Sequence, residues 1–336
     1  MKKILLPVLF SVAAVTFVHA AEPYHLLKEI PVGGDGGWDY ASVDSAAQRL
    51  YVSHGSKVVV IDTAKDVVAG EITNTPGVHG IAIASELHRG LVTCGREDKG
   101  ALVDLKTLQI ISKTDTGKNP DGMLFEPGQK EFYTFNGRGE SATVIDAQSG
   151  KVVATIPLGG KPEFAAADAK AGRVFNNIED KNEVVAIDTK THTVVNRWPI
   201  APNEEASGMA VNEKTHHLFL GCGGSKTMAM MDSTSGKILA SVPIGDGVDA
   251  NSFDPATGYA FASCSDGTVT IAKEDGDKLT VVQTLKTEKG CRTMTLDPAT
   301  HKIYLAAAKY EEPAAGQRRG KMVAGSFKVL VYGMDK

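Results

Sequence analysis

The chain has 336 residues, of which 42% are hydrophobic and 23% charged, and its formal net charge is −4. A chain of this length can form two ordinary domains or one large all-β domain, and this composition excludes wholesale disorder. The slight acidic excess disfavours generic nucleic-acid binding, because no surplus of positive charge is available to hold a polyanion.

The first 20 residues have the pattern of a secretory signal peptide. Lys2 and Lys3 form a basic start, residues 4–18 form an apolar run, and Ala20 provides a small residue at the expected cleavage point. The apolar run is short for a membrane span, so a membrane anchor is the less favoured alternative. We predict an exported bacterial protein, periplasmic or secreted, whose mature chain covers residues 21–336 and has no membrane span.

An apolar residue followed by aspartate recurs along the mature chain. Asp62, Asp104, Asp146 and Asp188 follow one another at intervals of 42 residues, and Asp232 comes 44 residues later. Each repeat contains four short β-rich segments separated by polar turns, without helical periodicity. Four strands in about 40–45 residues are typical of one blade of a β-propeller.

Seven such repeats can be counted in the mature chain. Their inner strands are expected to begin near Asp39, Gly80, Gly122, Phe164, Gly208, Ala250 and Arg292. The seventh repeat lacks a fourth strand of its own, while residues 24–30 form a spare strand before the first repeat. We predict an all-β, seven-bladed β-propeller in a single domain over 21–336, closed by this N-terminal strand, since closure removes two exposed strand edges. An open β-solenoid, the alternative fold, would not account for the missing and spare strands.

Several of the repeats resemble a known sequence pattern. Tyr51-Val52-Ser53-His54 followed by Val60-Ile61-Asp62-Thr63, and Tyr133-Thr134-Phe135-Asn136 followed by Val144-Ile145-Asp146-Ala147, are similar to the YVTN repeat of YncE-like seven-bladed β-propellers. The resemblance covers essentially the whole mature chain. Propellers of this kind resemble lactonases, a virginiamycin-type lyase and quinoprotein subunits, so the resemblance implies a fold rather than one function. The acidic chain departs from the DNA binding ascribed to some members.

Charged side chains recur just before the inner strands, where the loops of a propeller converge beside its central channel. The residues at these positions are Trp38, Asp39, His79, Asp121, Glu163, Glu205, Asp249 and Arg292. Neighbouring carboxylates repel one another, which raises their pKa values or attracts a cation. We predict a polar-ligand pocket at this channel mouth, with His79 as the candidate acid/base. The candidate ligands of a divalent cation are Asp39, His79, Asp121, Glu163, Glu205 and Asp249. Solvated turns with acidic caps are the alternative interpretation.

A second set of residues recurs at the end of each second strand. It comprises His54, Cys94, Asn136, Ile178, Cys222, Cys264 and Ala307, and His54 is a further candidate for ligand binding. Disulfides are common in exported proteins, and Cys264–Cys291 is the plausible pair, because Cys94 and Cys222 belong to distant blades. The remaining histidines of the repeats are expected as surface residues on the opposite face: His88, His192, His216, His217 and His301.

The last repeat contains an unusually long loop over residues 309–325. It carries Arg318 and Arg319, and long loops in compact domains are usually functional or disordered. We predict a basic flap beside the acidic channel mouth, with both arginines available to an anionic group.

Three functions remain open. The favoured hypothesis is a monomeric, exported binding protein or scaffold that uses the channel mouth for a small polar ligand or a periplasmic protein partner. The second is a metal-assisted enzyme of the lactonase or lyase type. The third is a propeller subunit associated with a redox cofactor that a partner supplies, because the chain has no C-x-x-C-H motif for covalent haem.

Overall fold

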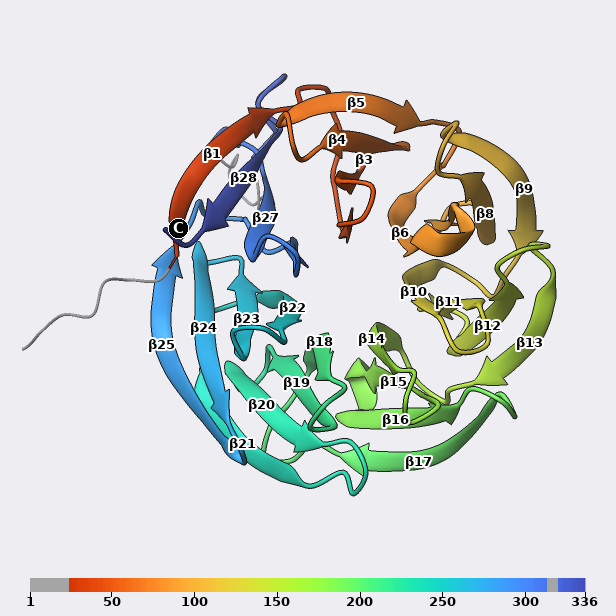
Figure 1. Ribbon diagram of the computed structural model, residues 1–336, viewed down its shortest axis with the longest axis vertical. Coiled ribbons are helices and arrows are strands. Elements are labelled where there is room, and N and C mark those ends of the chain that lie inside the picture. The colour runs from red at the N-terminus through yellow and green to blue at the C-terminus, as the bar shows by residue number, and fades with distance from the viewer. Residues whose placement is uncertain (1–23, 313–319, 336) are drawn as a thin grey trace, which may run out of the picture.

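The computed structural model describes residues 24–312 and 320–335, and these form seven four-stranded antiparallel sheets. The inner strands are β2 (Ala41–Asp44), β6 (Val78–Ala84), β10 (Pro120–Glu126), β14 (Pro162–Asp168), β18 (Ala206–Asn212), β22 (Val248–Asp254) and β26 (Met294–Asp297). The second strands are β3 (Arg49–His54), β7 (Arg89–Cys94), β11 (Glu131–Asn136), β15 (Arg173–Ile178), β19 (His217–Cys222), β23 (Tyr259–Cys264) and β27 (Lys302–Ala307). The sheets stand around a central axis like the blades of a propeller (Figure 1). The predicted all-β, seven-bladed fold is therefore confirmed.

Two further strands complete each blade toward the outside. The third strands are β4 (Lys57–Asp62), β8 (Lys99–Asp104), β12 (Ser141–Asp146), β16 (Glu183–Asp188), β20 (Thr227–Asp232), β24 (Thr268–Asp275) and β28 (Lys328–Gly333). The outer strands are β5 (Val67–Ile72), β9 (Gln109–Asp115), β13 (Val152–Pro157), β17 (Thr193–Pro199), β21 (Ile238–Pro243), β25 (Lys278–Lys286) and β1 (His25–Pro31). The short 3-10 turns η1 (Ser85–Leu87) and η2 (Glu179–Lys181) are the helices of the described residues, and neither is long and apolar enough to cross a membrane.

The ring closes through the two ends of the described chain. The last sheet has the order β1-β28-β27-β26, and β1 pairs antiparallel with β28 from His25 opposite Gly333 to Pro31 opposite Lys328. In Figure 1 the red β1 lies beside the dark blue β28. This is the predicted closure by the N-terminal strand, which pairs an edge of β28 that would otherwise stay open.

The repeated apolar-aspartate dipeptide has a structural origin at the end of each third strand. The apolar residue, such as Ile61, is buried between blades, and the aspartate caps the turn to the outer strand. Asp62 Oδ1 accepts hydrogen bonds from the backbone N–H groups of Ala64 and Lys65, each at 3.0 Å. Asp104 and Asp188 cap the equivalent turns in the same way. The repeated dipeptide is thus explained by hydrogen bonding in these turns and does not indicate a catalytic site.

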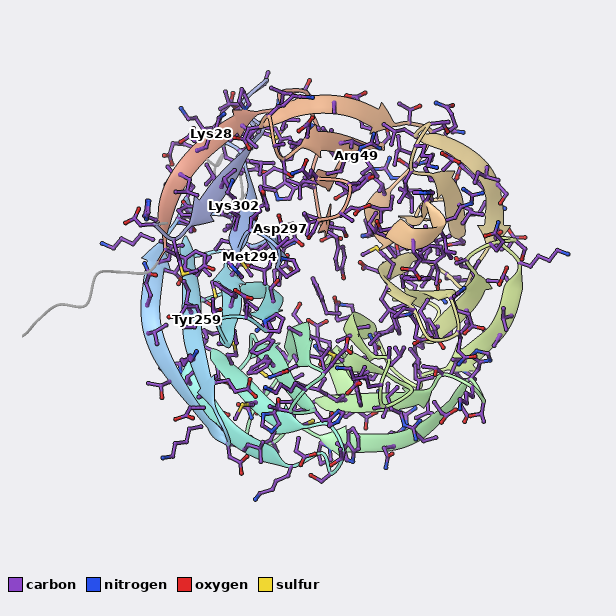
Figure 2. All side chains as sticks on the ribbon, viewed as in Figure 1. Lys28, Arg49, Tyr259, Met294, Asp297 and Lys302 are labelled. Carbon is purple, nitrogen blue, oxygen red and sulfur yellow. The ribbon has the colours of Figure 1, made fainter. Side chains whose placement is uncertain are left out.

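The hydrophobic core consists of layers between neighbouring blades, and side chains fill this space around the whole ring (Figure 2). Second strands are the most buried, and every residue of β11 and of β19 is buried. The outer strands are mostly exposed, as β5 and β13 show. Each blade therefore depends on its neighbours for a core, which holds the inner strands and their loops in a rigid ring.

The predicted disulfide between Cys264 and Cys291 is not formed, and all four cysteines are free and buried. Cys264 packs with residues of blades five and six, including Phe219. Cys291 packs on the other side of the blade-six sheet, in the cluster that contains Tyr24 and Leu330. The two thiols therefore pack in separate hydrophobic clusters on either side of the blade-six sheet.

Four of the five histidines expected on the surface form ion pairs between blades instead. The pairs are His192 Nε2–Glu131 Oε2 at 2.9 Å, His216 Nδ1–Asp168 Oδ2 at 2.6 Å, His217 Nδ1–Glu274 Oε1 at 2.6 Å and His301 Nδ1–Asp254 Oδ2 at 2.8 Å. In each pair the carboxylate belongs to a blade next to that of the histidine, and the side chains of Asp168 and Asp254 are fully buried. Only His88 is exposed as expected. The histidines join blades on the face opposite the channel mouth.

Replacing His216 by alanine is expected to lower the free energy of unfolding by about 2 kcal/mol, because the buried Asp168 carboxylate loses its hydrogen-bond partner. His88→Ala is the matched control. It occupies the same left-handed turn position, but its ring has no ion pair among the described residues, so the expected change is within about 0.5 kcal/mol. Urea unfolding of both variants at pH 7 measures the difference, and equal stabilities would show that the histidine pairs do not join the blades.

Candidate functional site

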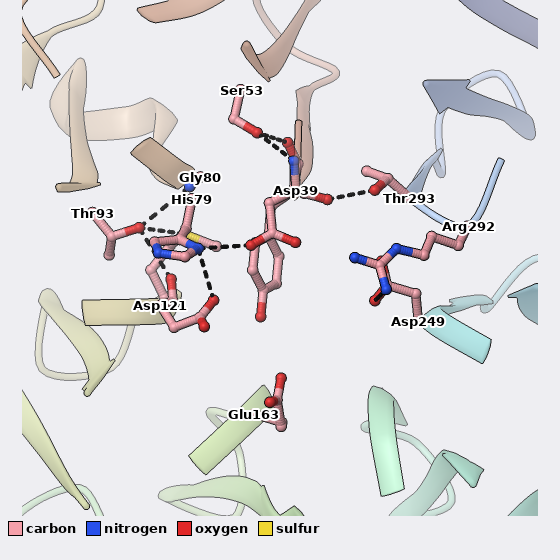
Figure 3. A network of polar contacts seen from close by, with 12 residues as sticks. Asp39, Ser53, His79, Gly80, Thr93, Asp121, Glu163, Asp249, Arg292 and Thr293 are labelled. Atoms are coloured by element: carbon pink, nitrogen blue, oxygen red, sulfur yellow. Dashed lines mark hydrogen bonds and ion pairs between the residues drawn. The ribbon is translucent and has the colours of Figure 1, made fainter. Parts of the chain in front are cut away.

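The loops that lead into the seven inner strands place one side chain each at the channel mouth. The strand register shows that these positions are equivalent. In each blade, the residue two positions further along the chain pairs with the corresponding residue of the second strand, as Ile81 does with Val92 and Met209 does with Leu220. We call this set the mouth ring: Asp39, His79, Asp121, Glu163, Ser207, Asp249 and Arg292. Figure 3 shows six of them gathered about one centre. The sequence had singled out all of them except Ser207.

Glu205 does not belong to the mouth ring, which corrects its inclusion among the candidate ligands. It is exposed and lies two residues before Ser207, the true equivalent of the ring carboxylates. The Glu205 N–H donates to Asn182 Oδ1 at 2.7 Å, and the Glu205 carbonyl accepts from Gly223 N–H at 2.9 Å. Its backbone therefore builds the rim of the mouth, and its side chain faces solvent.

His54 lies outside the channel as well. It is only 1% exposed and stacks on Phe327, with 4.0 Å between the ring centroids. Burial lowers the pKa of His54, and the charge of Lys57 adds to this. The neighbouring Trp38 is half-buried at the mouth and packs on Phe327 and Tyr310. Arg318 and Arg319, the predicted flap residues, lie outside the described residues.

Asp39, His79 and Asp121 form the tightest group of the mouth ring. His79 Nδ1 lies 2.7 Å from Asp39 Oδ2 and 3.2 Å from Asp121 Oδ1, so one ring nitrogen sits between two carboxylates (Figure 3). One donor atom from each residue lies within 4.8 Å of the other two. Carboxylate oxygen and imidazole nitrogen at such separations are suitable ligands for a divalent metal ion.

The remaining charged groups of the mouth ring have their own counterions. Arg292 Nη1 lies 3.5 Å from Asp249 Oδ1, and Lys161 Nζ lies 2.5 Å from Glu163 Oε1 and 2.5 Å from Glu179 Oε2. Together with Asp39 and Asp121 these side chains line a polar cavity of about 270 Å³, which we call the cup. Within the cup, the two aspartates beside His79 are the carboxylates without a lysine or arginine partner in the described structure.

The cup shifts the ionisation of its residues toward neutral pH. Burial raises the pKa of Asp121 to about 6, opposed by the charge of His79. Burial also raises the pKa of Glu163 to about 7 and that of Asp249 to about 6, against Lys161 and Arg292 respectively. Burial acts to lower the pKa of His79, but its hydrogen bond to Asp39 and the charge of Asp121 raise it overall. Shifts of this kind cluster at functional sites.

An aromatic pair forms the floor of the cup. Tyr40 and Phe164 follow the ring residues of blades one and four, and their ring centroids lie 4.7 Å apart, so the pair crosses the axis of the propeller. The same position in blade two is Gly80, where a Cβ would lie 2.6 Å from Tyr40 Cβ. Small residues at this level therefore make room for two large rings. The sequence pattern indicates Phe164 only as the start of an inner strand and gives no signal for Tyr40.

Hydroxyl groups fix the backbone of the mouth ring. Thr93 Oγ1 donates to the Asp121 carbonyl at 3.0 Å and accepts from Gly80 N–H at 3.3 Å, which ties blade two to blade three. Thr293 Oγ1 donates to the Asp39 carbonyl at 2.6 Å, and Ser53 Oγ accepts from the Asp39 N–H at 2.9 Å (Figure 3). The cup is thus preorganised by neighbouring blades rather than by flexible loops.

Comparisons with known proteins support the fold. No protein-family model matches the sequence, and no curated protein matches it. Among solved structures, the chain is similar to a chain of hydrazine synthase from Kuenenia stuttgartiensis, with a TM-score of 0.70 and 18% identity, over 82% of this chain and 94% of that chain. At this identity the likeness shows the fold alone. The protein is therefore a seven-bladed β-propeller, whereas the resemblance to YncE-like propellers stays a prediction.

Proposed function

We propose that this protein is an exported binding protein that holds a divalent cation in its cup on Asp39, His79 and Asp121, and uses the open coordination positions of that cation to bind a small polar ligand. The observation that carries the proposal is the position of His79 Nδ1 between two carboxylates, with the three donor atoms within 4.8 Å of one another. Export rests on the signal-peptide pattern of residues 1–20.

The chemistry of the three ligands favours a metal ion with both oxygen and nitrogen preferences, such as Mn²⁺ or Zn²⁺. Three protein ligands leave positions for water or a ligand, as in metal sites that act on small molecules. A cation would also relieve the repulsion among the buried carboxylates, because only His79 separates Asp39 from Asp121. Arg292 and Lys161 already neutralise the other side of the cup.

One observation favours a metal-assisted enzyme as the second candidate. Burial raises the pKa of Glu163 to about 7, and a carboxylate that titrates near neutral pH can serve as a general base. Glu163 lines the same cup as Asp39 and Asp121. In this alternative Glu163 moves the proton, and His79 is a metal ligand rather than the acid/base expected from the sequence.

Calorimetric titration of the chelator-treated mature protein with MnCl₂ tests the proposal. One Mn²⁺ per chain is expected, and Asp39→Asn/Asp121→Asn should abolish the binding. Glu204→Gln, which removes an exposed rim carboxylate, is the matched control and should bind like the wild type. Absence of Mn²⁺ and Zn²⁺ binding, or equal binding by the double variant, would contradict the proposal.

Gly95→Ala is expected to lower Mn²⁺ affinity roughly tenfold without unfolding the protein, by analogy with the loss of groups that orient metal ligands. A Cβ at Gly95 would lie 2.6 Å from His79 Nε2, so the imidazole must move. The Gly95 backbone is outside the left-handed region, so the substitution adds no backbone strain, and outside His79 the nearest atom to the new Cβ is Asn119 Oδ1 at 3.3 Å. The control is Gly37→Ala, where a Cβ meets nothing within 4 Å. If both variants bind Mn²⁺ equally in calorimetry, the position of His79 does not determine binding.

A further inference from the structure

A second, larger cavity of about 760 Å³ opens outside the cup, over blades one to three. Asp39 and Arg292 line both cavities, whereas His79 lines the outer cavity and Asp121 lines the cup. A molecule in the outer cavity can therefore contact Asp39 and His79, two of the three residues that we propose as cation ligands.

Two arginines of the outer cavity have no partner in the part of the chain that the structure describes. Arg96 and Arg138 line it and occupy equivalent positions, each two residues after a second strand, β7 and β11. Within residues 24–312 and 320–335, neither guanidinium has a hydrogen bond or ion pair, and both side chains are exposed. The equivalent positions of blades four and six are acidic, Asp180 and Asp266. Arg96 and Arg138 thus place positive charge over the blades that carry His79 and Asp121, and blade seven has a third basic residue, Lys309, at this position.

The charge balance of the outer cavity depends on the cation. Without it, Asp39 in the lining repels an incoming anion, and so does Asp121 in the adjoining cup. With a divalent cation in place, both carboxylates are neutralised. Asp98 is then the one acidic side chain left in the outer-cavity lining, against Arg96 and Arg138 and against Arg292, which is paired with Asp249. Asp98 Oδ1 already accepts the Asn119 N–H at 2.7 Å. The cation-loaded cavity is therefore electropositive.

We infer that the outer cavity binds a small anion, a carboxylate or a phosphate. One oxygen of the anion coordinates the cation, and its other oxygens accept hydrogen bonds from Arg96 and Arg138, whose planar guanidinium groups match both kinds of oxyanion. The inference rests on the proposed function, since it requires the cation, and it names the class of ligand that the cation would recruit. Anion binding then follows cation binding in a fixed order.

Calorimetry with two probes tests this inference. Malonate and inorganic phosphate are each titrated into the mature wild-type protein, with saturating Mn²⁺ and after chelation. At least one probe should bind only in the presence of Mn²⁺, and the stronger probe distinguishes carboxylate from phosphate. Arg96→Gln/Arg138→Gln should weaken that probe at least tenfold while the Mn²⁺ affinity stays within about twofold. Lys190→Gln/Lys214→Gln, on exposed turns of the opposite face, removes the same charge and should change neither.

The outcomes separate the two proposals. If Mn²⁺ itself does not bind, both are wrong. If Mn²⁺ binds but neither probe does, or if the arginine double variant binds the probe as tightly as the lysine double variant, the cation site stands and the anion site is wrong. Equal anion binding with and without Mn²⁺ would also contradict the inference.

Discussion

Replacing His79 by alanine is expected to lower the affinity of the cup for Mn²⁺ by about 100-fold or more. The substitution removes the nitrogen that lies 2.7 Å from Asp39 and 3.2 Å from Asp121, leaving two carboxylates with nothing between them. Loss of groups that merely orient ligands costs 10–100-fold in metal affinity, and loss of a ligand itself should cost at least as much. Calorimetric titration with MnCl₂ at pH 8 measures the change.

The control for this variant must show that the fold survives. His88→Ala removes an exposed histidine from the opposite face and should bind Mn²⁺ like the wild type. His79→Ala should unfold in urea with the same cooperativity as the control, because the blades pack through their second and third strands rather than through the mouth ring. A folded His79→Ala protein with unchanged Mn²⁺ affinity would show that the imidazole is not a ligand.

Lowering the pH from 8 to 5 is expected to weaken Mn²⁺ binding by about 100-fold, because the cation must displace protons from its ligands. Asp121, with its pKa raised by burial to about 6, binds a proton across this range. The pKa of His79 is raised despite its burial, so its imidazolium must also release a proton before the ring can bind the cation. Titration at half-unit pH intervals measures the slope, and Asp121→Asn should reduce it. A flat profile would contradict the assignment.

The same shifts predict how stability varies with pH in the metal-free protein. In the folded protein the pKa values of Asp121, Glu163 and Asp249 are raised. Their contribution to the free energy of unfolding is therefore fully present below the ordinary carboxyl pKa, and it is lost as the pH rises through about 6 to 7. The raised pKa of His79 acts in the same direction. Mn²⁺ should therefore increase the melting temperature more at pH 8 than at pH 5.

The fold was predictable because its determinants are local and repeated. The aspartates that cap the turns, such as Asp62 and Asp104, recur with the length of one blade and so reveal the repeat. The pairing of the strands then follows from blade geometry. Ring closure by β1 followed from counting strands. The mouth ring was mostly predictable for the same reason, since one strand register places equivalent residues together.

The errors arose where a local pattern gives no information on side-chain direction. Glu205 was chosen for its charge, but register places Ser207 at the mouth. His54 ends its strand like Cys94 and Cys222, and this position faces the core between blades. The four histidine-carboxylate pairs join residues about 50 to 60 positions apart, and sequence spacing did not reveal them. The direction of a side chain and its pairing with residues far away in the sequence are set by tertiary packing, which local sequence patterns do not describe.

The most direct test of the cation site is anomalous X-ray diffraction from crystals of the mature protein grown with MnCl₂. We expect a manganese peak in the cup, within bonding distance of Asp39, His79 Nδ1 and Asp121, and no such peak in crystals of Asp39→Asn/Asp121→Asn. A manganese ion bound elsewhere with the cup empty, or no manganese peak at full Mn²⁺ saturation, would contradict the proposed cation site.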